Sequence, residues 1–249
     1  MTDSFKNSGQ WAAEDLRVLL WDIDGTLVRS HRRDAYKDYT VPVLENVFGT
    51  AGRLREMTVS GMTDLQIVVE ALRDEGFTPA QIRERVADLR THYMLEMERA
   101  TREGTQGFQV LPGVRQVLEA TLEHPRYFNS LLTGNIEPAA QLKMQLVNLS
   151  QFFQLPGAFG DDSHDRRDLP ALAVERINRH LGLNLAPHQF IVIGDTPNDI
   201  ACARHGCMRA VAVGTGRMYS QDDLLAHSPD AFLPDLSDVE LVLKTFAQF

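Results

Sequence analysis

Short apolar runs recur along the chain, and each of them predicts a buried β-strand. The runs hold four to seven residues, are rich in Val, Ile, Leu or Phe, and are each followed directly by a Gly or an Asp. This length and punctuation favour strands over helix segments. A predominantly apolar strand is typical of a parallel sheet that is covered on both faces. The predicted strands are residues 16–21, 127–133, 190–194 and 210–213.

Helical patterns separate these strands. Pro near the first position of a helix and Gly just beyond its last position are start and stop signals. The predicted helices are residues 113–123 after Pro112, 139–148 after Pro138, and a helix with Pro170 in its first turn that ends near residue 181, before Gly182. Strands that alternate with helices predict a doubly wound α/β domain, in which helices cover both faces of a parallel sheet.

One stretch breaks this alternation. From residue 31 to residue 105 the sequence shows helical periodicity and no strand-like run. Helices are predicted at residues 33–48, at 63–74, and at 79–100, the last as one long helix or two. We therefore expect an all-helical domain at residues 31–105, inserted into an α/β core that consists of residues 1–30 and 106–249.

Composition narrows the class of protein. The 249 residues are 43% hydrophobic, which suffices for a sizeable core, and the net charge is −9. An acidic chain without a basic stripe is a poor ligand for nucleic acid. No apolar run approaches the roughly 18 residues of a membrane span, and residues 1–10 lack the apolar centre of a signal peptide. Two cysteines are too few for a disulfide framework. We expect a soluble, cytoplasmic protein with neither a nucleic-acid nor a membrane partner.

The strongest chemical signal is Asp22-x-Asp24-Gly25-Thr26, which directly follows the first predicted strand. In open α/β sheets, ligands bind at the carboxyl ends of the strands. The two-residue spacing allows one side chain and one backbone carbonyl to face a shared ion while the other carboxylate stays nearby. Such close carboxylates repel each other unless a hard cation such as Mg²⁺ lies between them. The alternative is an Asp-Gly turn without a ligand.

Three other ligand-binding motifs fit the sequence less well. A calcium-binding loop is excluded because Gly25 follows Asp24 directly and no Glu occupies the twelfth position. A Walker A phosphate loop is excluded because the chain contains no Gly-Lys pair. A dinucleotide fingerprint at residues 214–219 is disfavoured because Tyr219 replaces its third Gly.

The sequence Thr133-Gly134-Asn135 ends another predicted strand and opens a helix. A hydroxyl, a Gly that permits close backbone approach, and a helix N-terminus together can hold an anion. Because Thr and Asn also cap helices for structural reasons alone, capping is the alternative for Asn135.

Two further carboxylates follow the strand at residues 190–194. Asp195 ends that strand, and Asp199 stands near the first turn of the helix that Pro197 begins. Both are expected to face the same crevice as Asp22, where they add ligands for a metal ion. Interaction with the helix dipole is the alternative for Asp199.

An acidic site that binds an anionic substrate also needs a positive side chain. Arg166 and Arg167 stand just before the helix that contains Pro170. The planar guanidinium group matches two phosphate oxygens and does not lose its charge. One of these arginines is expected to face the site, within a charged segment that is otherwise solvated.

Taken together, these motifs resemble those of the haloacid dehalogenase superfamily of phosphohydrolases. The first matches Asp22-x-Asp24-Gly25-Thr26, the second Thr133, and the fourth Asp195 and Asp199. The helical insert resembles the cap of the phosphoglycolate phosphatase and β-phosphoglucomutase branch. The third motif departs from that branch, which usually has Lys followed by Pro. The segment Asp165-Arg166-x-x-Leu169 resembles an Arg-bearing variant and favours Arg166 over Arg167.

The resemblance implies a mechanism. Asp22 would attack phosphorus to form an aspartyl-phosphate, and Asp24 would protonate the leaving oxygen and then accept a proton from water. Mg²⁺ would be held by Asp22, the Asp24 carbonyl, Asp195 and Asp199. The phosphate-binding residues would be Thr133, Gly134, Asn135 and Arg166. The implied activity is a phosphomonoesterase for a small phosphorylated metabolite.

Other functions remain open on this sequence. A phosphomutase of the β-phosphoglucomutase type would share every motif named above. A catalytically inactive binding protein on the same fold is a further alternative, although a retired site has no need to keep mutually repelling carboxylates. Cys202 and Cys207 are expected to be buried packing residues, and residues 60–63 could reach over the substrate.

Overall fold

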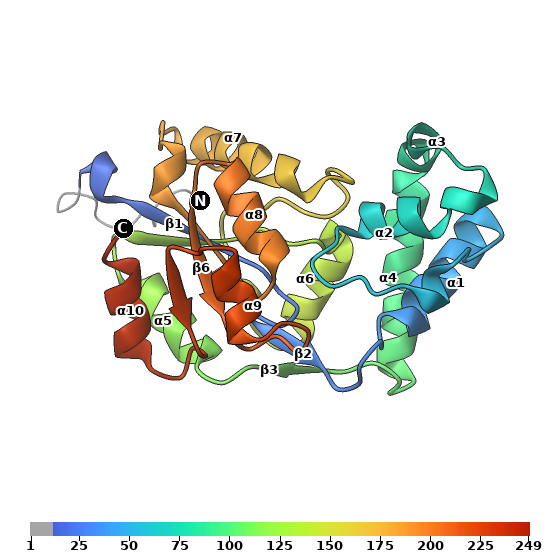
Figure 1. Ribbon diagram of the computed structural model, residues 1–249, viewed down its shortest axis with the longest axis horizontal. Coiled ribbons are helices and arrows are strands. Elements are labelled where there is room, and N and C mark those ends of the chain that lie inside the picture. The colour runs from blue at the N-terminus through green and yellow to red at the C-terminus, as the bar shows by residue number, and fades with distance from the viewer. Residues whose placement is uncertain (1–11) are drawn as a thin grey trace.

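The computed structural model of the chain describes residues 12–249, so the segment compared with signal peptides lies outside the described residues. Five parallel strands form a sheet in the order β4-β1-β5-β6-β7 (Figure 1). This sheet confirms the predicted α/β class and all four predicted strands, and it adds β7. The strands are β1 (Arg17–Trp21), β4 (Tyr127–Leu131), β5 (Phe190–Gly194), β6 (Arg209–Val213) and β7 (Ala231–Leu233).

Helices cover both faces of this sheet, as the apolar strands require. Leu19 and Trp21 of β1 belong to one apolar cluster, whereas Val18 and Leu20 point to the other face and belong to a second. The first cluster includes side chains of α5 (Val114–Glu123), α6 (Glu137–Leu146) and α10 (Val239–Phe246). The second includes side chains of α7 (Leu169–Leu181), α8 (Pro197–His205) and α9 (Gln221–Ala226).

The stretch from residue 31 to residue 105 contains helices and no strand (Figure 1). Its apolar side chains form a cluster that also includes Ile136 and Ala139. The segment predicted as one helix or two is two, because the chain leaves helical geometry at Arg85. The first helix begins four residues later than predicted, and the second ends at Ala71, after which residues 73–75 form a 3-10 turn. The four helices are α1 (Lys37–Phe48), α2 (Asp64–Ala71), α3 (Pro79–Glu84) and α4 (Val86–Arg102).

A two-stranded antiparallel ribbon, which the periodicity did not predict, joins this helical stretch to the sheet. It pairs β2 (Val28–Ser30) with β3 (Phe108–Val110). Three-residue strands are too short to show an alternating pattern in a sequence. The ribbon brings both ends of the helical stretch together, next to the loop that follows β1.

Among residues 12–249, no helix combines the length and the apolar character needed to cross a bilayer. The expected cytoplasmic location stays a prediction.

Candidate active site

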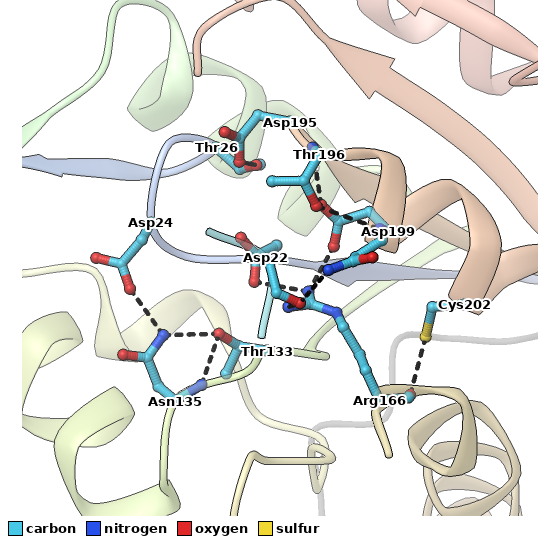
Figure 2. A network of polar contacts seen from close by, with 12 residues as sticks. Asp22, Asp24, Thr26, Thr133, Asn135, Arg166, Asp195, Thr196, Asp199 and Cys202 are labelled. Atoms are coloured by element: carbon cyan, nitrogen blue, oxygen red, sulfur yellow. Dashed lines mark hydrogen bonds and ion pairs between the residues drawn. The ribbon is translucent and has the colours of Figure 1, made fainter. Parts of the chain in front are cut away.

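The topology brings three predicted site segments to one edge of the sheet. Strand β1 lies between β4 and β5, so Asp22, Thr133 and Asp195 follow adjacent parallel strands at their carboxyl ends. Asp22, Asp195 and Asp199 are all buried, and each offers one oxygen atom within 4.8 Å of the others. Figure 2 shows the carboxylates of Asp22 and Asp199 beside the guanidinium of Arg166, and that of Asp195 next to Thr26. The structure thus assembles the acidic cluster that the sequence predicted.

Burial and mutual repulsion shift the acidity of this cluster. Removal from water and the neighbouring Asp199 raise the pKa of Asp22 to about 7, against the lowering effect of Arg166. Burial, Asp22 and Asp199 likewise raise the pKa of Asp195 well above its ordinary value. Three carboxylates held in this way are stabilised by a positive charge between them.

The loop after β1 depends on glycine. Gly25 has a φ of +93°, and a Cβ atom there would lie 2.3 Å from Asp195 Oδ2. Only Gly accepts both the left-handed backbone and this close approach. The next residue, Thr26, donates a hydrogen bond from Oγ1 to Asp195 Oδ1 at 3.2 Å. The Gly and the Thr of the first motif therefore seat the carboxylate of the fourth.

Asp199 has two structural partners as well as its place in the cluster. Its Oδ2 accepts hydrogen bonds from Thr196 N at 3.0 Å and Thr196 Oγ1 at 2.7 Å, which form a capping box at the start of α8. Its Oδ1 pairs with Arg166. One oxygen of Asp199 thus caps the start of α8 while the other contacts Arg166 in the acidic cluster, so Asp199 has a structural role as well as a place in the cluster.

The two candidate arginines face opposite environments. Arg166 is 6% exposed, and its Nη2 lies 3.0 Å from Asp22 Oδ1. Among the described residues, its buried Nε has no hydrogen-bond partner. The side chain of Arg167 is 61% exposed and pairs with Asp165. The structure therefore brings Arg166, and not Arg167, to the acidic cluster.

The second motif packs against the helical stretch. Thr133 is fully buried, and its Oγ1 accepts a hydrogen bond from Asn135 Nδ2 at 2.8 Å. The carbonyl of Gly134 accepts a hydrogen bond from Asp64 N at 2.7 Å. A Cβ on Gly134 would lie 2.1 Å from Met62 O, so this Gly permits the close approach of residues 62–64.

The carboxylate of Asp24 points to a different group of residues. Its Oδ2 accepts hydrogen bonds from Asn135 Nδ2 at 2.8 Å and from Lys143 Nζ at 2.6 Å. The side chain of Asp24 is 43% exposed and is not one of the three clustered carboxylates. This placement is consistent with the expectation that Asp24 offers its backbone carbonyl, and not its side chain, to a metal ion.

Lys143 is a site residue that the sequence did not predict. Lys143 lies on the buried face of α6 together with Ala139, Ala140 and Met144. Burial lowers the pKa of Lys143, but Asp24, Tyr39 and Asp64 together outweigh that effect, so the net pKa is raised and the ammonium stays charged. A Lys on the apolar face of a predicted helix is a signal that could have found it.

Asp64 was also missed. It is the first residue of α2, and its Oδ2 accepts a hydrogen bond from Ile136 N at 2.6 Å, across the junction between the helical stretch and the sheet domain. Burial raises the pKa of Asp64 to about 7, although the bond from Ile136 opposes this shift.

A cavity of about 460 Å³ lies between the sheet edge and the helical stretch. Ser60, Gly61 and Met62 line it, which agrees with the expectation that this segment reaches over the site, whereas Thr63 caps α2. Other lining residues are Asp22, Asp24, Lys143, Arg166, Tyr36 and Tyr39.

The two cysteines lie in different environments. Cys202 is buried and donates from Sγ to Arg166 O. The expectation that Cys207 is buried was wrong: Cys207 follows the end of α8 with a φ of +54° and is exposed.

A family comparison agrees with this geometry. The model of the haloacid dehalogenase-like hydrolases matches residues 16–206, which include the first, second and fourth motifs. The chain belongs to the haloacid dehalogenase-like hydrolases. No curated protein matches this hydrolase in the sequence search.

Solved structures share the fold of this haloacid dehalogenase-like hydrolase. A hydrolase from Pseudomonas syringae is 21% identical with a TM-score of 0.62, and the match covers 92% of this chain and 98% of that one. A predicted phosphoglycolate phosphatase from Haemophilus somnus is 19% identical with a TM-score of 0.56 and the same coverage. A proposed β-phosphoglucomutase from Thermotoga maritima is 19% identical with a TM-score of 0.55, over 92% and 99% of the two chains.

The residues of this hydrolase fit a magnesium ion. Mg²⁺ prefers carboxylate and carbonyl oxygens at about 2.1 Å, so two oxygens on one ion lie up to about 4.2 Å apart. The separations of at most 4.8 Å among Asp22, Asp195 and Asp199 are close to that geometry. The raised pKa of Asp22 shows that a further positive charge would stabilise the ionised cluster.

Proposed function

We propose that this hydrolase is a Mg²⁺-dependent phosphomonoesterase that acts on a small phosphorylated metabolite. The observation that carries the proposal is the position of Asp22. Its carboxylate lies beside the Arg166 guanidinium and the other two clustered carboxylates, at the wall of a cavity large enough for a small metabolite.

Asp22 acts as the nucleophile in this proposal. One of its oxygens attacks phosphorus while the bond between phosphorus and the leaving alcohol breaks, which forms an aspartyl-phosphate. Asp24 donates a proton to the leaving oxygen. Water then attacks the aspartyl-phosphate, Asp24 takes up a proton from that water, and inorganic phosphate leaves with Asp22 regenerated.

Other residues bind the phosphoryl group and the ion. Arg166, Thr133 and Gly134 hold the phosphoryl oxygens, and the unpartnered Nε of Arg166 is a donor available for that purpose. Asn135, which the sequence placed among these residues, instead donates from Nδ2 to Asp24 and Thr133. Mg²⁺ would be held by Asp22, Asp195, Asp199 and the Asp24 carbonyl, and when bound it offsets negative charge on the transferring group.

Residues 31–105 serve as a cap in this proposal. Residues 60–62 line the cavity opposite the carboxylates, and Gly61 O accepts hydrogen bonds from Arg166 Nη1 at 3.3 Å and Asn198 Nδ2 at 3.0 Å. A cap in this place limits the access of bulk water to the aspartyl-phosphate.

The test is phosphate release from p-nitrophenyl phosphate and from a panel of small phosphorylated metabolites, with Mg²⁺ present. We expect the wild-type protein to release phosphate and Asp22→Asn to lose at least about 10³-fold in turnover while its fold is kept. An Asn variant that retained a tenth of the rate would exclude Asp22 as the nucleophile. Glucose 1-phosphate belongs in the panel, because isomerisation without phosphate release would indicate a phosphomutase.

A further inference from the structure

Lys143 occupies a place that a core helix ordinarily gives to an apolar residue. It shares the buried face of α6 with two alanines and Met144, and it is 2% exposed. Burying an ammonium group is unfavourable unless hydrogen-bond acceptors compensate its charge. A lysine in this position therefore indicates partners that depend on it.

Two of its partners belong to the proposed active site. Lys143 Nζ lies 2.6 Å from Asp24 Oδ2 and 2.6 Å from Asn135 Oδ1. Asn135 Nδ2 donates to the same Asp24 Oδ2 at 2.8 Å, which closes a ring of three hydrogen bonds. The ring engages one oxygen of Asp24. Among the described residues, the structure gives Oδ1 of Asp24 no hydrogen bond.

The two hydrogen-bond donors to Asp24 are themselves held in place by other residues. Lys143 Nζ lies 5.3 Å from the ring centre of Phe108 in β3, the strand that leads back from the helical stretch, and Asn135 is tied to Thr133. Without these partners, a carboxylate that is 43% exposed would be free to change rotamer in water. Fixing such a group in advance removes an entropic cost from the reaction.

We propose that Lys143 is a positioning residue that holds Oδ2 of Asp24, so that Oδ1 exchanges protons with the leaving group and then with water. The inference rests on the proposed function. A proton on Oδ2 would meet two hydrogen-bond donors, Lys143 and Asn135, and would displace one of them. A proton on Oδ1 displaces neither.

The dependence of the rate on the leaving group tests this role. Proton donation matters for an alkyl phosphate, whose alkoxide is a poor leaving group, and much less for p-nitrophenyl phosphate. The ratio kcat/KM reports the steps up to aspartyl-phosphate formation. For Lys143→Met we expect kcat/KM to fall about 30-fold or more on an alkyl phosphate from the panel, and about threefold or less on p-nitrophenyl phosphate.

Three matched variants accompany this measurement. Asp24→Asn should show the same preference for the aryl substrate, and the Asp24→Asn, Lys143→Met double variant should show no further loss on the alkyl substrate. Arg176→Met breaks an ion pair with Asp162 outside the active-site cavity and should leave the ratio between the two substrates unchanged. If Lys143→Met does not fold, Lys143→Gln, which keeps a donor but no charge, should show the same preference to a smaller degree.

The outcomes separate this inference from the proposed function. Equal losses on both substrates, or wild-type kinetics in the Lys143 variants, would overturn the positioning role while the phosphatase activity stands. A wild-type protein that released phosphate from neither substrate would overturn the proposed function and this inference with it.

Discussion

Arg166 Nη2 lies 3.0 Å from Asp22 Oδ1, although 144 residues separate the two in the chain. The same nitrogen also pairs with Asp199. All three side chains are buried, and the positive charge of the guanidinium compensates two carboxylates that are removed from water. This contact joins the third motif to the first and the fourth.

Replacement of Arg166 by Ala is expected to harm both stability and substrate binding. The change leaves Asp22 and Asp199 without a compensating charge, which costs about 3–5 kcal/mol in the free energy of unfolding, and it removes a donor for phosphoryl oxygens. Arg167→Ala is the matched control, because that side chain is 61% exposed and should alter stability by less than about 0.5 kcal/mol. Urea unfolding measures the change in stability, and the KM for p-nitrophenyl phosphate measures the change in substrate binding. A larger increase in KM for Arg167→Ala would reverse the assignment.

Removal of divalent ions is expected to abolish phosphate release. EDTA should stop hydrolysis of p-nitrophenyl phosphate, and excess Mg²⁺ should restore it, because the ion compensates three neighbouring carboxylates. Saturating Mg²⁺ should also raise the Tm, since an ion that binds only the folded state stabilises it. Asp195→Asn is expected to weaken both responses. Full activity in EDTA would contradict the metal assignment.

The carboxyl group of Asp64 is expected to make stability depend on pH. Its pKa is raised to about 7 in the folded state from an ordinary value of 3.8, so the folded state binds the proton more tightly, and this contribution to stability is lost as pH rises from about 4 to 7. Asp64→Asn removes the titration and keeps an acceptor for Ile136 N. The free energy of unfolding of this variant, relative to the wild type, should therefore increase by about 1–3 kcal/mol between pH 5 and pH 8. Parallel profiles in urea unfolding would show that Asp64 does not titrate in this range.

Arg90 of α4 is expected to support closure of the proposed cap. Its Nη1 lies 2.6 Å from Asp161 and its Nη2 lies 2.6 Å from Glu137, both outside the helical stretch. Arg90→Met should raise the KM of a panel substrate about fivefold, since a half-exposed ion pair contributes about 1 kcal/mol. Arg99→Met is the control, because within residues 12–249 Arg99 forms its ion pairs with Glu96 and Glu103 of its own segment. Equal effects of the two substitutions would argue against a closing role.

Local sequence patterns determined the α/β class, four strands of the sheet and several helix boundaries, whereas α9 and α10 were not predicted and α6 lies two residues earlier than predicted. Apolar runs of strand length and helices that begin near Pro and end near Gly are properties of neighbouring residues, so they can be read without knowledge of the fold. The expected place of Asp22, Thr133 and Asp195 also followed from a local fact. Each stands directly after a strand, and parallel strands end at one edge.

Only the tertiary structure decided which side chains meet there. Arg166 and Arg167 are adjacent in the sequence, and the path of a single 3-10 turn directs one into the acidic cluster and the other into solvent. Lys143 reaches Asp24 across 119 residues because α6 packs its buried face beside the second motif. Such contacts depend on how distant segments pack. Burial then sets their energies, because two opposite charges attract more strongly out of water and a buried charge without a partner is costly. The sequence by itself therefore determined the strands and helices and the edge of the sheet at which the site lies. Packing between distant segments decided which side chains contact one another there.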